Sequence, residues 1–179
     1  MLQHKSFYVN LFAMANALKA KIKQRADFKS PAVEAILNLM VAADEVRTRI
    51  DRVFSAHNIT YGQYNVLRIL RGAGSEGHPR CEIAARMIER APDITRIVDR
   101  LEKQKLVERE RSDEDRRHSV TKVTEKGLEL IERMEPEMQK ANDEIAQKLS
   151  TVEWVALTAL CEKIYAEQAA NAEPGAKYS

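Results

Sequence analysis

Two short alternating segments interrupt a chain whose apolar residues otherwise recur at helical spacing. Residues 106–110 and 119–123 alternate between apolar and polar side chains, which is typical of strands with one buried face. The stretch between them is dense in charges of both signs, and this favours an exposed polar turn. The pattern therefore predicts a small β-hairpin within a mainly α-helical protein.

Helical periodicity extends on both sides of this hairpin, and local end signals mark several boundaries. Ser30-Pro31 is an N-cap followed by a first-turn proline, Thr124 is a second N-cap, and Ser150–Glu153 is a capping box. Pro136 should kink the helix that contains it. The predicted helices cover residues 7–22, 31 to about 57, 64–70, 83–87, 92 to about 105, 125–149 and 151 to about 170.

The order of these elements indicates a fold. The segment GAGSEGHP, residues 72–79, holds three glycines and a proline, so we predict a loop there. Two short helices follow it, and then the hairpin, which is the order of a winged helix-turn-helix. The outer helices carry apolar stripes too long for so small a core, and this indicates that they dimerise. We expect a mainly α fold with a small β-hairpin wing and with N- and C-terminal dimerisation helices.

Composition excludes several classes of protein. The chain has 179 residues, of which 44% are hydrophobic and 31% charged, so it is long enough for a globular core and is not disordered. The formal net charge is only +2, and any nucleic-acid binding must therefore come from the local arrangement of charge. No segment approaches the roughly 20 apolar residues of a membrane span, and no cleavable leader is evident.

Cysteine and histidine usage gives further expectations. Two cysteines, Cys81 and Cys161, do not make a disulfide framework, so we expect a cytoplasmic protein. The four histidines share no metal-ligand spacing with one another or with cysteine, and we predict no metal site. Neither a nucleophile–base pair nor a glycine-rich phosphate loop stands out. We therefore predict neither a cofactor nor an enzymatic activity.

The helix predicted from Pro92 to about Lys105 has two contrasting faces. Its apolar stripe is Ile94, Ile97, Val98 and Leu101. The opposite face presents Asp93, Thr95, Arg96, Asp99, Arg100 and Lys103. A donor-rich face before a charged hairpin suits insertion into the major groove of DNA. The alternative is a solvated helix face of mixed charge.

The charged turn also allows two interpretations. Arg111, Arg116 and Arg117 at a hairpin tip suit a narrow minor groove, where the potential is strongly negative. The neighbouring carboxylates then hold the guanidinium groups in place by paired hydrogen bonds. The alternative is a solubilising turn whose surface ion pairs contribute little.

Taken together, the helix and the turn resemble a known family. The run ITRIVDRLEKQKLVERERSDEDRRHSVTKVTEKG, residues 94–127, is similar to the recognition helix and wing of MarR-family transcriptional regulators. The resemblance implies a homodimer, repression of transcription from a pseudo-palindromic operator, and double-stranded DNA as the partner. It also implies a recognition helix in the major groove and a wing in the flanking minor groove.

The resemblance also implies roles for single residues. Arg117 would enter the minor groove with Asp115 orienting it, and Thr95 and Arg96 would reach bases or phosphates. The DNA-binding residues are then Pro92, Asp93, Thr95, Arg96, Arg100, Arg116 and Arg117. Asp93 suits the helix dipole or accepts from a cytosine amino group. Three departures are Ala91, where relatives often have a capping hydroxyl, Asp93, whose carboxylate would repel phosphate, and Lys105, where many have glycine. A different helix-to-strand turn is expected at Lys105.

The same resemblance suggests three parts and an effector. The parts are residues 1–57 for dimerisation and an effector cleft, 58–123 for DNA binding and 124–179 for dimerisation. A small aromatic or anionic ligand would draw on Met40, Arg47, His57, Tyr61 and Tyr64, although ordinary packing explains each of them as well.

Two alternative functions stay open at the level of sequence. A thiol switch would use Cys81 beside Arg80, although we expect Cys81 to be a buried, inert residue and Cys161 to lie in the core. The second alternative is a winged-helix module that binds protein rather than DNA.

Overall fold

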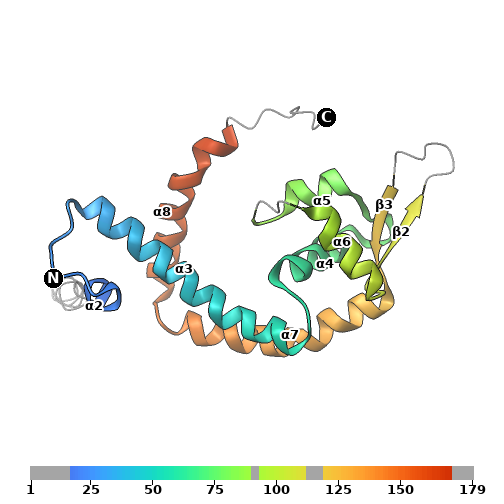
Figure 1. Cartoon of the computed structure of the whole chain (residues 1–179), viewed down its shortest axis with the longest axis horizontal. Coiled ribbons are helices and arrows are strands. Elements are labelled where there is room, and N and C mark those ends of the chain that lie inside the picture. The colour runs from blue at the N-terminus through green and yellow to red at the C-terminus, as the bar shows by residue number, and fades with distance from the viewer. Residues whose placement is uncertain (1–16, 90–92, 112–118, 171–179) are drawn as a thin grey trace. The chain divides into compact units, whose positions relative to one another are not determined.

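The computed structural model describes residues 17–89, 93–111 and 119–170 (Figure 1). The chain divides into two compact units, residues 1–61 and 62–179. The described elements are helices apart from one small three-stranded sheet, so the predicted fold class is confirmed. No helix in the described ranges is long and apolar enough to cross a membrane.

The first unit contains helices α2 (Ala17–Ile22) and α3 (Pro31–Ala56). The predicted start of α3 is confirmed, because the Ser30 side chain accepts a hydrogen bond from the backbone N–H of Val33 at 3.3 Å. An ion pair between Lys21 and Glu45 joins the two helices. Residues 7–16, the rest of the predicted first helix, lie outside the described residues.

The second unit holds the helix-turn-helix. Its helices are α4 (Tyr61–Ala73), which begins at the last residue of the first unit, α5 (Arg80–Arg86) and α6 (Ile94–Lys103). All three contribute side chains that are fully buried: Val66, Leu67, Leu70, Ile83, Val98 and Leu101. This shared core fixes the orientation of α6, whose apolar stripe was predicted from its spacing.

The sheet adds one strand that the sequence did not predict. Strands β2 (Val107–Arg111) and β3 (Ser119–Val123) form the predicted antiparallel hairpin, and the order across the sheet is β1-β3-β2. The prediction of a loop over residues 72–79 was wrong for most of its length. Gly72 and Ala73 belong to α4, Gly74–Glu76 is the 3-10 helix η1, and His78–Pro79 is strand β1, which pairs with Thr121 and Val120 of β3.

Gly77 makes the third strand possible. Its φ of +63° is a conformation that favours glycine, and a Cβ there would lie 2.7 Å from Lys122 Cγ and nearer still to the carbonyl oxygen of Thr121. A strand of two residues has no periodicity of its own, so only this tertiary contact reveals it.

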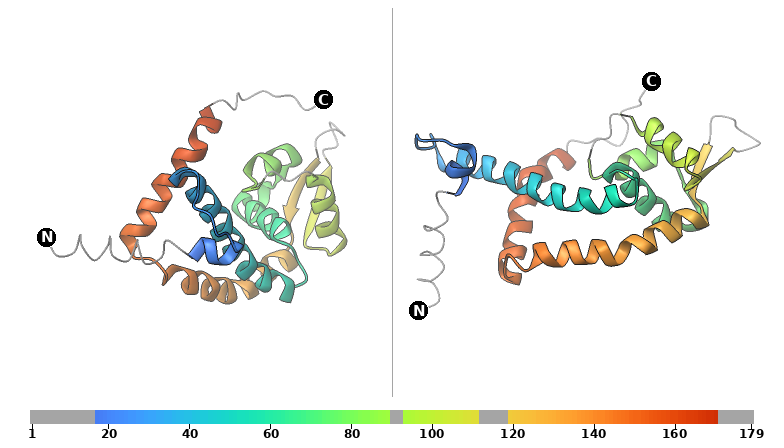
Figure 2. Two further views of the ribbon diagram at one scale, coloured as in Figure 1. Left: turned by 60° about the vertical axis from the view of Figure 1, so that its left-hand side comes forward. Right: turned by 60° about the horizontal axis from the view of Figure 1, so that its bottom comes forward.

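Strand β3 leads directly into the long helix α7 (Glu125–Ala146), as both views of Figure 2 show. The predicted cap is confirmed, because Thr124 Oγ1 accepts from the backbone N–H of Gly127 at 3.1 Å. The helix ends at Ala146, before the predicted residue 149, and the indole N–H of Trp154 donates to the Ala146 carbonyl at 2.9 Å. A distant side chain thus satisfies a carbonyl at the helix end.

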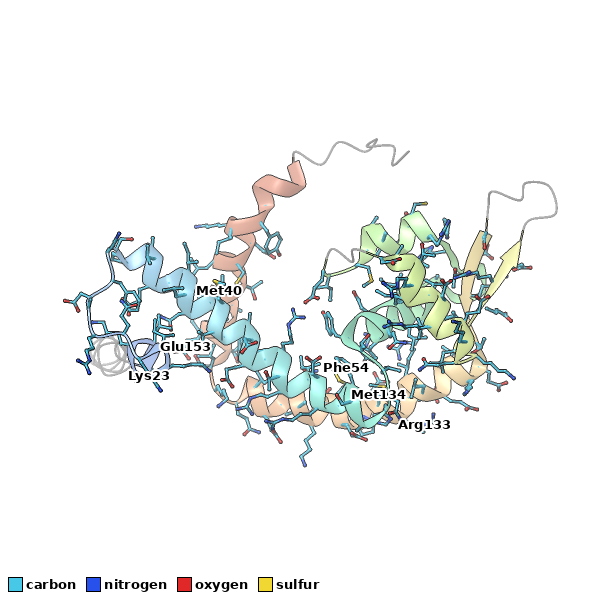
Figure 3. All side chains as sticks on the ribbon, in the orientation of Figure 1. Lys23, Met40, Phe54, Arg133, Met134 and Glu153 are labelled. Atoms are coloured by element: carbon cyan, nitrogen blue, oxygen red, sulfur yellow. The ribbon has the colours of Figure 1, made fainter. Side chains whose placement is uncertain are left out.

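Helix α8 (Thr151–Ala170) begins at the predicted capping box. The backbone N–H of Ser150 donates to the Glu153 carboxylate at 2.8 Å, and the N–H of Glu153 donates to Ser150 Oγ at 3.4 Å. The pKa of Glu153, which is labelled in Figure 3, is lowered because both the backbone and the hydroxyl of Ser150 donate to its charged form.

Candidate nucleic-acid interface

Helix α6 begins two residues later than the sequence predicted. Asp93 has a non-helical φ of −151°, and its carboxylate accepts from the backbone N–H of Arg96 at 3.0 Å, so Asp93 is the N-cap rather than a first-turn residue. The cap therefore lies two residues after Ala91, the position where relatives often have a capping hydroxyl. Ala91 and Pro92 lie outside the described residues, so the predicted DNA contact of Pro92 stays a prediction.

The exposed face of α6 carries the basic residues predicted to bind DNA. Arg96, whose side chain is 73% exposed, has its Nε 3.7 Å from Asp93 Oδ2. Arg100 and Lys103 are exposed on the same helix, while Val98 and Leu101 are buried. Thr95 is half-buried, and its hydroxyl accepts from Arg80 Nη1 at 3.0 Å. The structure thus brings Asp93, Thr95, Arg96 and Arg100 together on one helix.

Arg109 of β2 connects this helix to the hairpin, a role that the sequence did not show. Its Nη2 forms an ion pair with Asp99, and its Nη1 lies 3.4 Å from a carboxylate oxygen of Glu102. Asp99, predicted on the open face of α6, is therefore turned toward the hairpin. A signal for this contact was present in the sequence. Asp99 and Glu102 are about one helical turn apart and so share a helix face, and Arg109 follows them in the predicted strand.

The turn between α6 and β2 keeps a glycine-like geometry despite its lysine. Lys105 has a φ of +60°, and its N–H donates to the Glu102 carbonyl at 2.9 Å, while that of Leu106 donates to Leu101 at 3.0 Å. This pair of bonds is a Schellman motif. Lys105 thus adopts the left-handed conformation that glycine adopts without strain, and the expected difference from the turn of relatives with glycine stays a prediction.

The hairpin is also anchored to α7. The N–H of Thr124 donates to the Leu106 carbonyl at 3.1 Å, and Thr124 Oγ1 donates to the Lys105 carbonyl at 2.8 Å. At Gly127, a Cβ would lie 2.8 Å from Val123 Cγ2 and nearer still to the Leu106 oxygen. The missing side chain therefore allows the first turn of α7 to pack against the start of the hairpin.

Charge pairing continues along the described part of the hairpin. Lys122 of β3 forms an ion pair with Glu110 of β2, and this hydrogen-bonded contact raises the pKa of Lys122. Residues 112–118 lie outside the described residues. The predicted roles of Asp115, Arg116 and Arg117 therefore stay predictions, and of Arg111 only the backbone is described.

The comparisons with known proteins bear on the same region. The model of the MarR family matches residues 59–119. A MarR transcription factor from Planctomyces limnophilus is 34% identical and has a TM-score of 0.61, with 76% of this chain and 98% of that chain covered. The chain belongs to the MarR family. The resemblance inferred from residues 94–127 is thereby confirmed.

Two further comparisons agree with this assignment. The regulator PrsX of Escherichia coli is 31% identical over 119 residues, which cover 64% of this chain and 72% of PrsX. A cysteine-to-serine mutant of MarR from E. coli, solved with operator DNA, shares the fold at 22% identity, with a TM-score of 0.68 and coverage of 78% of this chain and 99% of that chain. PrsX is described as a transcriptional regulator and the P. limnophilus protein as a transcription factor, in agreement with the prediction that this MarR-family chain is not an enzyme.

The residues suggested for an effector are divided between the two units. Met40, labelled in Figure 3, is 63% exposed on α3. The guanidinium of Arg47 lies 5.9 Å from the centroid of the Tyr61 ring, and His57 is the C-cap of α3. Tyr64 belongs to the second unit, is buried, and accepts a hydrogen bond from Arg68 Nη1 at 3.3 Å. The structure brings Arg47 and Tyr61 together, and the predicted ligand site stays a prediction.

The cysteines differ from expectation. Cys81 is exposed rather than buried. The residue of α5 that packs into the core is Ile83, and a side chain two positions earlier points to a different side of the helix. Cys161 is half-buried on α8. Within the described ranges, no group of three histidine, cysteine or acidic residues has the arrangement to hold a metal ion.

Proposed function

We propose that this chain is a dimeric, sequence-specific DNA-binding regulator of transcription that acts as a repressor at a pseudo-palindromic operator. The observation that carries the proposal is the exposed basic face of α6, braced by Arg109 against the β2–β3 hairpin. The likeness to a MarR protein solved with operator DNA supports it.

In this proposal α6 enters the major groove. Arg96 and Arg100 face outward and reach bases or phosphates, and Thr95 lies beside them. The carboxylate of Asp93 already caps the helix, and a bond to a cytosine amino group would use its second oxygen. Repulsion between that carboxylate and nearby phosphates favours a base contact for Asp93 over a backbone contact.

The wing supplies the second contact. We propose that Arg117 enters the minor groove, that Asp115 orients its guanidinium, and that Arg116 contacts phosphate. The strands below this turn are fixed to α6 through Arg109 and to α7 through Thr124. Such bracing limits the conformational entropy that the arginines lose when they dock.

Dimerisation is proposed from the apolar surface of α8. The helix is exposed at Val152, Val155, Leu157, Leu160, Ile164 and Tyr165. These residues lie on more than one side of the helix, and a helix that is apolar on several sides is stable in water only when other helices cover it. We propose that a second copy of the chain covers this surface, because a two-fold homodimer is the commonest closed assembly.

The three parts then divide the work. Residues 58–123 bind DNA, and residues 1–57 and 124–179 hold the two copies together. A small aromatic or anionic effector bound near Met40, Arg47, His57, Tyr61 and Tyr64 would relieve repression by changing the spacing of the two α6 helices. The proposed place of action is the cytoplasm, in keeping with two cysteines that make no disulfide framework.

Salt dependence tests the proposal against a protein-binding role for the same hairpin. The operator is first selected from random duplexes, and its affinity is then measured by fluorescence anisotropy between about 50 and 200 mM salt, where about six phosphate contacts lower it by roughly 10³. Half-sites should lie about 10 base pairs apart. Arg117→Ala should abolish tight operator binding. Salt-independent binding, or none, would contradict the proposal.

A further inference from the structure

Arg80, at the start of α5, makes a side-chain contact with the proposed DNA-reading helix. Its Nη1 donates a hydrogen bond of 3.0 Å to Thr95 Oγ1 in the first turn of α6. Thr95 is half-buried and Arg80 is exposed. The two residues are 15 positions apart in the chain, and the contact therefore depends on how α5 packs against α6.

The backbone of Arg80 is held by the sheet. It directly follows β1, whose residues His78 and Pro79 pair with Thr121 and Val120 of β3. Gly77, just before β1, approaches β3 so closely that no Cβ fits. The base of the Arg80 side chain is thus fixed to the hairpin, while its guanidinium is fixed to α6. A long side chain held at both ends loses little further conformational entropy when DNA binds.

The contact has a chemical consequence for the threonine hydroxyl. A hydroxyl carries one donor hydrogen and two acceptor lone pairs. The Arg80 N–H occupies one lone pair of Thr95 Oγ1, and its positive charge repels a further donor while strengthening the O–H as a donor. Thr95 is therefore prepared to donate to an acceptor: a purine N7, a guanine O6 or a thymine O4 in the major groove.

We propose that Arg80 is a positioning residue that fixes the Thr95 hydroxyl as a hydrogen-bond donor toward base edges and so helps to set the preferred operator sequence. The inference rests on the proposed DNA-binding function. A direct phosphate contact by Arg80 is the competing explanation, and it makes a different prediction, because phosphate contacts act uniformly on all sequences and steepen the salt dependence.

The experiment uses the full-length protein and fluorescein-labelled duplexes that the unaltered protein selects from a random library. Affinity is measured for Arg80→Met, for Thr95→Val, which has nearly the same shape but no hydroxyl, and for the double variant. Each protein is titrated against the selected duplex and against duplexes changed at one base pair at a time, at several salt concentrations. Thr95→Ser keeps the hydroxyl, and Arg80→Lys keeps the charge.

The expected result is that Arg80→Met lowers discrimination by about tenfold at one position in each half-site, the order expected for one base contact. The slope of log affinity against log salt should change by less than about half a unit, since no phosphate contact is lost. In the Thr95→Val background Arg80→Met should add nothing, because both changes remove the same prepared donor. Thr95→Ser should retain the preference, and Arg80→Lys should retain part of it.

Arg86→Met is the matched control. Arg86 is also an exposed arginine of α5, but its Nε pairs with Glu82 at 2.6 Å on the same helix. The substitution removes the same charge from α5 without touching Thr95 and should leave the base preference unchanged.

Three results would overturn the inference. The first is an unchanged base preference in Arg80→Met. The second is a slope of log affinity against log salt that is reduced by about one unit while the base preference stays intact. The third is an equal loss of base discrimination on Arg80→Met whether residue 95 is Thr or Val. Failure of the unaltered protein to bind any duplex would instead reject the proposed function, so the two failures are distinguishable.

Discussion

Replacing Gly127 by alanine sets two effects of opposite sign against each other. Gly127 lies in the first turn of α7, and alanine in a helix is more stable than glycine by roughly 1 kcal/mol. The added Cβ would, however, lie 2.8 Å from Val123 Cγ2 and 3.2 Å from the Leu106 carbonyl carbon, and nearer still to its oxygen. Ordinary contacts between carbon atoms begin at about 3.5 Å.

The steric effect should dominate. The Leu106 carbonyl also accepts from Thr124 N–H at 3.1 Å, so moving it away from the new methyl group weakens a bond worth about 1 kcal/mol. Overpacking of this kind costs about 1–3 kcal/mol more. After subtracting the helix-propensity gain of about 1 kcal/mol, the net loss of folding free energy is about 1–3 kcal/mol.

Urea denaturation at a fixed protein concentration, followed by circular dichroism, measures this difference. Gly72→Ala is the matched control, because Gly72 lies in α4 and a Cβ there would meet no atom within 4 Å. The control should be unchanged or more stable by up to about 1 kcal/mol. If Gly127→Ala were as stable as the unaltered protein, with the same m-value, the close packing of α7 against the hairpin would be refuted.

Three further changes test other parts of the structure. Lys105→Gly should stabilise the fold by about 0.5–1 kcal/mol in the same urea assay, because relief of left-handed strain exceeds the gain in unfolded entropy; Lys105→Ala, which keeps the strain, should not. Because the pKa of Glu153 is lowered in the folded protein, its capping contribution to stability is present above the pKa of the unfolded chain and is lost as pH falls through the pKa of the folded protein. NMR titration of the Glu153 carboxyl should show the lowered pKa, and Glu153→Gln should remove the associated pH dependence of stability. Leu160→Glu on α8 should shift the sedimentation coefficient from dimer to monomer, whereas an unchanged dimer would exclude this face from the interface.

Local signals account for the parts of the fold that the sequence predicted. A cap depends on side-chain and backbone atoms within about four residues, so Ser30, Thr124 and Ser150 could be assigned from the sequence alone. The buried stripe of α6 was equally accessible, because helical spacing alone decides which side chains share a face. Asp93 shows the limit of this approach: two adjacent residues, Pro92 and Asp93, were both compatible with a helix start.

Most of the missed features are contacts between residues that are separated along the chain. Strand β1 has two residues, and only pairing with β3 distinguishes it from a loop. Arg109 could have faced solvent or α6, and the strand register decided between them. The ending of α7 at Ala146 coincides with a bond from Trp154, eight residues later. The candidate wing residues 115–117 were assigned by resemblance, and no local physical signal distinguishes them from an ordinary charged turn.

The contacts around α6 determine which motions are available to a regulator of this kind. Arg109 joins α6 to β2, Arg80 joins it to the end of β1, and Thr124 and Gly127 join the start of the hairpin to α7. Moving the hairpin against α6 would break the ion pairs of Arg109, whose side chain is only 29% exposed, and leave a partly buried charge unpaired. Moving α7 carries helix and hairpin together and breaks none of these bonds. A signal that alters DNA affinity is therefore expected to act through the position of α7, leaving the local geometry of α6 intact.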